Sequence, residues 1–317
     1  MVTLPEIVIA PRRRALEDEH MHRDHRRSPT VTAVDIGGTH VSAAIVDTEL
    51  RIRDEQRRPL DADAPAHQVL DQIAGCVRER HLDTTRIAIA VPGPFDYSRG
   101  IGDFEGVEKF ARLRAVDVRE ELASRWDRDP GTLRFVNDAE AFGLGEWAAG
   151  AGGRARRCVS MTLGTGIGSA FIDRGRCLTT GTEVPADGNL HTVEVDGAPL
   201  EEHVSRRALI GAFRDRAGRT VDVAEIAELA RRGHRDAAEI LTAGMEVLGT
   251  ALAPWLRAFR AERLVIGGSM AASADLLFPP LHAQLTSLMT AAPPVVQGAL
   301  GAERASLIGA LIGTSAR

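Results

Sequence analysis

The spacing of apolar and polar positions predicts a protein in which strands and helices alternate. Short apolar runs bounded by turn residues predict buried strands, and apolar positions three or four apart predict helices. The strands are expected at 31–36, 41–46, 86–91, 133–136, 160–163, 167–173 and 263–266, with a more polar strand from Arg51 to Leu60. The helices are expected at 66–80, 117–126, 139–147, 221–231, 237–259 and 303–312, the fifth closing near Pro254-Trp255. This order indicates the α/β class.

The first two apolar runs flank a turn with candidate chemistry. The run from Val31 ends at Asp35, Gly37 and Gly38 turn the backbone before Thr39, and a second run leads to Asp47. This pattern predicts a tight β-hairpin. Glycine lets backbone N–H groups approach a phosphate, and a neighbouring carboxylate can hold magnesium. A plain hairpin turn fits the same residues.

A second stretch repeats this pattern. The segment 160–173 follows the first at an offset of 127 residues, which pairs Gly37 with Gly164 and Ser42-Ala43 with Ser169-Ala170. Two strand–turn–strand units in one chain indicate a duplicated fold. Two halves facing each other would place both glycine turns at a shared cleft.

Three other strands end in polar or glycine-rich segments, which is where open α/β sheets bind ligands. These segments are Pro92-Gly93-Pro94, Asn137-Asp138 and Gly267-Gly268. Each has an ordinary structural alternative. The first and third could be simple turns, and either residue of the second could only cap the following helix.

Charge and composition narrow the function. The chain has 317 residues, 44% of them hydrophobic and 26% charged, which suits a globular enzyme of two domains. A net charge of −5 gives no basic surplus for nucleic acid, so no nucleic-acid partner is expected. Lys109 is the only lysine and lies outside any Gly-x4-Gly-Lys phosphate loop. Phosphate binding is therefore expected from backbone donors, magnesium or arginine.

The remaining features point to the cytoplasm. Cys76, Cys158 and Cys177 are widely spaced, as in reduced proteins. No apolar run is long enough to span a membrane, and residues 1–30 lack the apolar centre of a signal peptide. We expect residues 1–30 to form a disordered tail, although three histidines between His20 and His25 could bind a metal.

Polar residues gather again after the second glycine turn. The segment 181–192 predicts a polar loop, and a helix is expected from Pro199 through Arg207. Such a loop suits recognition of a hydroxyl-rich ligand. A merely solvated loop is the alternative.

Taken together, five motifs in order resemble the ROK family of bacterial sugar kinases and sugar-responsive repressors. They are Asp35-Ile-Gly-Gly-Thr39, Pro92-Gly-Pro94, Asn137-Asp-Ala139 with Leu144-Gly-Glu146, Leu163-Gly-Thr-Gly-Ile-Gly168 and Val265-Ile-Gly-Gly268. The resemblance runs from about residue 31 to the C-terminus and implies a two-domain actin-like ATPase fold, with a ribonuclease H-like sheet in each half and a central cleft. The implied small domain comprises 31–138 and 304–317, and the large domain 139–303.

The resemblance also implies roles for individual residues. Asp138 matches the catalytic base that takes the proton from the attacking sugar hydroxyl, and Asn137 and Gly93 match the sugar site. The residues implied to bind ATP are Asp35 (through Mg²⁺), Gly37, Gly38, Thr39, Thr165, Gly166, Gly267 and Gly268.

One region departs from the family pattern. Many members carry Gly-Glu-x-Gly-His, a cysteine-rich zinc knot and then Leu-Glu. No cysteine follows Cys177 here, so that structural zinc site is not expected. Asn189 takes the usual glutamate position and Thr192 the usual histidine position, although His191 could substitute, and Glu201 is retained as a sugar ligand. These changes put plain glucose specificity in doubt and make an amino sugar such as kanosamine a candidate.

The sequence thus predicts a cytoplasmic kinase that transfers the γ-phosphate of ATP, with Mg²⁺, to a hexose or amino-hexose, most simply at the 6-hydroxyl, and the resemblance implies a homodimer. Two alternatives differ in class. A repressor of the same family needs a helix-turn-helix domain ahead of the first hairpin, and thirty polar residues are too few to build one. A non-catalytic sugar sensor has no need of a base such as Asp138.

Overall fold

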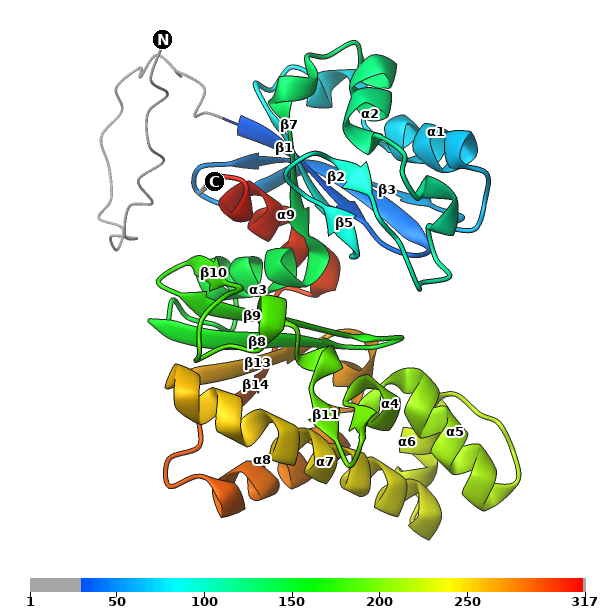
Figure 1. Cartoon of the computed structure of the whole chain (residues 1–317), viewed down its shortest axis with the longest axis vertical. Coiled ribbons are helices and arrows are strands. Elements are labelled where there is room, and N and C mark those ends of the chain that lie inside the picture. The colour runs from blue at the N-terminus through cyan, green and yellow to red at the C-terminus, as the bar shows by residue number, and fades with distance from the viewer. Residues whose placement is uncertain (1–29, 316–317) are drawn as a thin grey trace, which may run out of the picture. The chain divides into compact units, whose positions relative to one another are not determined.

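The computed structural model describes residues 30–315, which form two compact units (Figure 1). The first unit ends at Phe135 and the second begins at Val136. The expectation of a disordered tail, with its three histidines, falls almost wholly on residues outside the described part of the chain. No helix among residues 30–315 is both long and apolar enough to cross a membrane.

The first unit is built on a five-stranded sheet in the order β3-β2-β1-β4-β7. The predicted hairpin is present: β1 and β2 are antiparallel, with Asp35 opposite Ser42, and β4 runs parallel to β1. The polar strand β3 pairs with β2 at the edge of this sheet, where one face is open to water. The strands are β1 (Thr30–Ile36), β2 (His40–Asp47), β3 (Ile52–Pro59), β4 (Ile87–Val91) and β7 (Leu133–Asn137), with a small pair β5 (Phe95–Asp96) and β6 (Ile101–Gly102).

Two helices cover the apolar side of this sheet. Helix α1 (Ala66–Cys76) contacts β2, β3 and α2 (Val118–Trp126). Its apolar positions are fully buried, as the helical spacing predicts. The helix is shorter than expected because the chain leaves it at Val77 and forms a 3₁₀ turn. The unit's 3₁₀ turns are η1 (Glu79–His81), η2 (Ala111–Leu113) and η3 (Pro130–Thr132).

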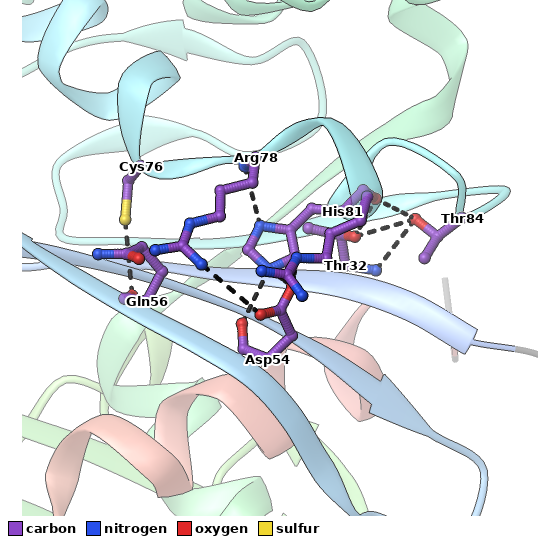
Figure 2. A network of polar contacts seen from close by, with 8 residues as sticks. Thr32, Asp54, Gln56, Cys76, Arg78, His81 and Thr84 are labelled. Atoms are coloured by element: carbon purple, nitrogen blue, oxygen red, sulfur yellow. Dashed lines mark hydrogen bonds and ion pairs between the residues drawn. The ribbon is translucent and has the colours of Figure 1, made fainter.

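A buried polar network fastens this 3₁₀ turn to the sheet (Figure 2). His81 accepts a hydrogen bond at Nδ1 from the backbone N–H of Arg78 (3.0 Å), and its Nε2 donates to the backbone oxygen of Asp54 (2.9 Å). The backbone oxygen of His81 also accepts from the hydroxyls of Thr32 and Thr84. Both ring nitrogens of the fully buried His81 side chain therefore have a hydrogen-bond partner in the protein.

The second unit repeats the same strand order, which confirms the predicted duplication. Its sheet runs β10-β9-β8-β13-β14, with β8 and β9 antiparallel and β13 parallel to both β8 and β14. The short strands β10 and β14 were not predicted, because three residues carry too little periodicity. The strands are β8 (Arg157–Leu163), β9 (Ile167–Asp173), β10 (Arg176–Leu178), β13 (Arg263–Gly267) and β14 (Val295–Gln297), with a small pair β11 (Glu194–Val195) and β12 (Ala198–Pro199).

The two hairpins differ by one residue at the turn. Ile36 pairs with Val41 in the first, whereas Leu163 pairs with Ile167 in the second. The offset is therefore 127 before the turn and 126 after it. Ser42 corresponds in register to Gly168, so the expected match of Ser42-Ala43 with Ser169-Ala170 is wrong by one residue.

Helices pack on the second sheet, and two of them differ from the helices that the sequence predicted. Pro199 lies in strand β12, and Ser205 breaks the expected helix by capping a new one through the N–H of Ala208. Helix α7 does not close near Pro254 but continues through it to Phe259. The helices are α3 (Asp138–Ala149), α4 (Glu201–Val204), α5 (Arg206–Ala217), α6 (Val223–Arg231), α7 (Arg235–Phe259), α8 (Ala274–Leu288) and α9 (Ala302–Gly313), with 3₁₀ turns η4 (Ala186–Gly188), η5 (Leu190–Thr192) and η6 (Ser269–Ser273).

The C-terminal helix packs backbone to backbone on α3. A Cβ on Gly309 would lie 1.7 Å from the carbonyl oxygen of Ala141, and one on Gly145 would lie 2.0 Å from that of Ala305. Only glycine permits this approach. The contact groups α9 with the second unit.

Candidate functional site

The first glycine turn lies at the end of β1. The N–H of Gly37 donates to the carbonyl oxygen of His40 (2.9 Å) and closes the turn. The hydroxyl of Thr39 and Nδ1 of His40 share a hydrogen bond of 2.9 Å on the exposed side. Asp35 is half-buried and is the second-last residue of β1, two positions before Gly37. The four predicted nucleotide-binding residues of this segment thus lie close together in sequence, Asp35 near the end of β1 and the other three in the turn that follows.

The Pro92-Gly93-Pro94 segment follows the buried strand β4 as expected. Gly93 is exposed, and the peptide bond between Gly93 and Pro94 is cis. The carbonyl oxygen of Pro94 accepts from the N–H of Phe104 (2.8 Å), which secures the loop to the segment beyond β6. The loop is held from within the first unit, and Gly93 presents its backbone to solvent.

The sequence left open whether Asn137 and Asp138 cap the following helix or contact a ligand, and the structure gives them different positions. Asn137 is the N-cap of α3, because its Oδ1 accepts from the N–H groups of Ala139 (2.9 Å) and Glu140 (3.1 Å). Asp138 is the first helical residue. Its Oδ1 accepts from the N–H of Ala139 (2.8 Å), and its Oδ2 makes no hydrogen bond with the described residues.

The environment of Asp138 favours a proton acceptor. Its side chain keeps some contact with solvent, yet the surrounding protein desolvates the carboxylate strongly enough to raise its pKa above the ordinary value of 3.8. The hydrogen bond from Ala139 opposes this rise without cancelling it. A carboxylate with a raised pKa is a stronger base than an exposed aspartate.

Glu146, at the other end of this motif, has a structural role. It is fully buried, and its carboxylate accepts hydrogen bonds from the N–H groups of Ala151 (2.8 Å), Ala299 (3.0 Å) and Leu300 (2.8 Å). It therefore joins the C-terminal end of α3 to the segment that precedes α9.

The second glycine turn is held by Glu201, the first residue of α4. The Oε2 atom of Glu201 accepts from the N–H of Ile167 (2.9 Å), and a Cβ on Gly166 would lie 2.8 Å from the same oxygen. Thr165 is exposed at the tip of the turn. The structure thus brings three predicted residues together: Thr165 and Gly166, assigned to the nucleotide, and Glu201, assigned to the sugar.

The predicted sugar loop is fixed by Ser169, which the sequence analysis named only as part of the repeated hairpin. The buried Ser169 hydroxyl donates to the carbonyl oxygen of Gly188 (2.6 Å) and accepts from the N–H of Leu190 (3.0 Å). Asn189 and His191 are half-buried around this anchor. Thr192 is exposed, and its hydroxyl donates to the carbonyl oxygen of Asn189 (3.1 Å).

Gly267 and Gly268 have packing constraints of their own. A Cβ on Gly267 would lie 2.3 Å from the ring of Phe142, and one on Gly268 would lie 2.4 Å from the carbonyl oxygen of Leu163. Gly268 also has a φ of +85°, a conformation that favours glycine. Close packing of the end of β13 against α3 explains Gly267, and close packing against the end of β8 explains Gly268. Their contact with adenosine stays a prediction.

The carboxylates suit magnesium better than zinc. Among residues 30–315, no three histidine, cysteine or acidic side chains are grouped as a metal site. Magnesium usually keeps several waters and takes one or two carboxylates together with phosphate oxygens. A single half-buried carboxylate, Asp35, beside a glycine turn fits that requirement.

Comparison with known families decides the relationship. The model of the ROK family matches residues 31–316. This chain belongs to the ROK family. Its relatives include a glucokinase of Thermotoga maritima, 29% identical over 88% of this chain and 97% of that protein, and an N-acetylmannosamine kinase of Citrobacter koseri, 27% identical over 88% and 97%.

Solved structures of the family share the fold. A ROK glucokinase from Streptomyces griseus, in complex with glucose and AMPPNP, superimposes with a TM-score of 0.72 at 22% identity, over 89% of this chain and 97% of that one. The predicted actin-like ATPase fold is confirmed, as is the predicted enzyme class, a sugar kinase.

Proposed function

We propose that this ROK kinase transfers the γ-phosphate of ATP to a hydroxyl of a hexose or amino-hexose, most simply the 6-hydroxyl, with Asp138 as the general base. The observation that carries the proposal is the separation of roles at the start of α3. Asn137 caps the helix, whereas Asp138 has a raised pKa and keeps one oxygen that makes no hydrogen bond with residues 30–315. Because Asn137 supplies the cap, the second oxygen of Asp138 is left for a substrate hydroxyl.

The nucleotide is assigned to the two glycine turns. Asp35 is proposed to hold Mg²⁺, and the backbone of Gly37, Gly38 and Thr39 to bind phosphate oxygens. Thr165 and Gly166 are proposed to bind phosphate at the second turn, where Thr165 is exposed. Bound MgATP supplies the phosphoryl group and spreads the charge that develops during transfer. Gly267 and Gly268 remain proposed adenosine neighbours.

The protein's own part in the reaction is binding and proton transfer. Asp138 Oδ2 would accept the proton of the attacking hydroxyl, because it is the carboxylate oxygen without a partner. Glu201 would orient the sugar with Oε1 while Oε2 stays bonded to Ile167. Asn137 and Gly93 are assigned to the same sugar.

The sugar itself depends on the loop anchored by Ser169. The half-buried Asn189 and His191 are better placed to contact a ligand than Thr192, which is exposed and already bonded to Asn189. An amide and an imidazole offer both donors and acceptors, so they suit an amino or acetamido group as well as hydroxyls. This supports glucose-like amino sugars, kanosamine among them, as candidates beside glucose.

A substrate screen tests the proposal. The purified protein is supplied with ATP and Mg²⁺ together with glucose, mannose, N-acetylglucosamine, N-acetylmannosamine or 3-amino-3-deoxyglucose, and ADP release is followed. The phosphorylated carbon is located by proton–phosphorus coupling in NMR spectra. Sugar-dependent ADP release, abolished in Asp138→Asn, is expected. Sugar binding in calorimetry with no ADP release for any sugar would support a non-catalytic sensor instead.

Two further expectations accompany this function. A homodimer is proposed by analogy with the family, and sedimentation of the full chain would measure it. A cytoplasmic location is proposed because ATP and sugar phosphates are cytoplasmic metabolites.

A further inference from the structure

The only lysine of the chain lies against the first glycine turn. Lys109 belongs to the loop between β6 and η2. A Cβ on Gly38 would lie 2.6 Å from its Nζ, 2.8 Å from its Cδ and 3.1 Å from its Cε. The end of the lysine side chain therefore lies along the glycine, in space that any other residue at position 38 would occupy.

The ammonium group has no partner there. Among residues 30–315, Lys109 forms no hydrogen bond or ion pair, whereas Glu105 of the same loop pairs with Arg114, the residue after η2, at 2.8 Å. Lys109 is exposed, so its charge is not suppressed by burial. A cation that lies beside the turn and forms no ion pair with a described carboxylate is available to an anion.

The turn offers neutral donors beside that cation. The N–H of Gly37 is used in closing the turn on His40, and the N–H of Gly38 makes no hydrogen bond with the described residues. The N–H of Gly38 and the ammonium group of Lys109 both lie at position 38. A backbone N–H and an ammonium group are donors that bind phosphate oxygens. The sequence predicted phosphate binding from backbone donors, magnesium or arginine, because Lys109 is not part of a Gly-x4-Gly-Lys phosphate loop.

We propose that Lys109 binds the terminal phosphate of the phosphoryl donor at the Gly37-Gly38 turn. This inference rests on the proposed function, since it assigns a donor contact within that same site. The ammonium would act as a point charge on the phosphate oxygens, and the glycine at position 38 would keep the space for its side chain open. Lys109 is thereby a donor-binding residue that the family motifs do not contain.

Amine acylation provides a test that does not depend on turnover. Because the chain has one lysine, N-hydroxysuccinimide acetate can modify only Lys109 and the terminal α-amino group, which serves as an internal control. Acylation is followed by peptide mass spectrometry with AMPPNP and Mg²⁺, with inorganic triphosphate, or with glucose alone. At a nucleotide concentration ten times its Kd, only the free protein reacts, so acylation of Lys109 should slow about tenfold.

The outcomes separate this inference from the function on which it rests. Protection of Lys109 by AMPPNP and triphosphate, with the α-amino group unaffected, supports the proposal. Unchanged acylation of Lys109 while calorimetry shows AMPPNP bound overturns it and leaves the kinase assignment intact. Protection by glucose alone also overturns it and assigns the lysine to the sugar. Absence of any AMPPNP binding overturns both.

Substitution gives a second measurement. Hydrogen bonds to charged groups are strong enough that Lys109→Ala should weaken AMPPNP binding about ten- to a hundredfold. Lys109→Arg, which keeps the charge, should restore part of that loss. Arg112→Ala removes an exposed cation of the neighbouring turn and should leave the Kd unchanged. Equal effects of Lys109→Ala and Arg112→Ala would show a general charge effect and refute a specific contact.

Discussion

The carboxylate of Glu201 accepts a hydrogen bond from the backbone N–H of Ile167, at 2.9 Å. This bond joins the first residue of α4 to the second glycine turn, although 34 residues separate the two along the chain. The other carboxylate oxygen makes no hydrogen bond with the described residues. One side chain can therefore hold the proposed phosphate turn and still contact a sugar.

Removing the Glu201 carboxylate should affect catalysis through both oxygens. Glu201→Ala leaves the Ile167 N–H without its acceptor. The variant should lower kcat/KM for the sugar about ten- to a hundredfold, because that factor corresponds to the loss of one hydrogen bond to a charged group. Glu201→Gln keeps an acceptor for Ile167 and should lose less. Glu202→Ala, an exposed neighbour on the same helix, is the control. Equal kcat/KM for the alanine variants at 201 and 202 would contradict the proposed role.

Asp138→Asn should abolish nearly all turnover while both substrates still bind. A positioned general base contributes about 10²–10⁴ in rate, and an amide cannot accept the hydroxyl proton. The loss should appear in kcat, measured by coupled ADP release, while calorimetry shows sugar and AMPPNP affinities close to those of the unmodified protein. Turnover near normal would refute Asp138 as the base.

The same substitution should stabilise the fold at neutral pH. Desolvation raises the pKa of Asp138 in the folded state, so the ionised carboxylate destabilises the native protein at pH values above that pKa. The penalty shrinks as pH falls through the raised pKa and is lost below the ordinary value of 3.8, where the carboxyl is protonated in both the folded and the unfolded state. Asp138→Asn should therefore have a higher Tm than the unmodified protein at pH 7.

Thermal unfolding at several pH values checks this expectation. The difference in Tm between Asp138→Asn and the unmodified protein should shrink as the pH is lowered. Asp83→Asn, at an exposed aspartate, provides a control whose difference should stay small throughout. A lower Tm for Asp138→Asn at pH 7 would mean that the charge stabilises the N-terminus of α3 more than burial destabilises it.

The sequence predicted the elements whose pattern is local. The hairpin of β1 and β2, the end of β7 at Asn137 and the helix α3 are each determined by apolar runs and turn residues that are neighbours in sequence. The glycine turns were found for the same reason, because the change from apolar residues to Gly-Gly is visible in a few positions. The duplication then followed from comparing two such local patterns.

What the sequence did not reveal depends on contacts between distant segments. Ser169 anchors a loop about twenty residues away, and nothing in its own neighbourhood distinguishes it from other serines in strands. The contact of Lys109 with Gly38 spans 71 positions and exists only once the sheet has formed. The break at Ser205 could have been detected, because a serine directly before a helical run is an N-cap signal.

The buried His81 should be important for stability and unimportant for catalysis. His81→Ala leaves the N–H of Arg78 without its partner and opens a cavity, so the free energy of unfolding should fall by about 1–3 kcal/mol for the unsatisfied group alone. Urea unfolding measures this change. His67→Ala, at an exposed histidine of α1, should change it little. Equal stability of the two variants would contradict the role of the network in Figure 2.

Two glycine-to-alanine substitutions should have opposite effects on stability. In Gly309→Ala the new Cβ would meet the carbonyl oxygen of Ala141 at 1.7 Å, which forces α3 and α9 apart and should cost about 1–3 kcal/mol or more. In Gly211→Ala, inside α5, a Cβ meets nothing within 4 Å, so the higher helix propensity of alanine should stabilise the protein by up to about 1 kcal/mol. Urea unfolding of both variants compares them directly. If Gly309→Ala were as stable as Gly211→Ala, the close approach of α3 and α9 would not be present in solution.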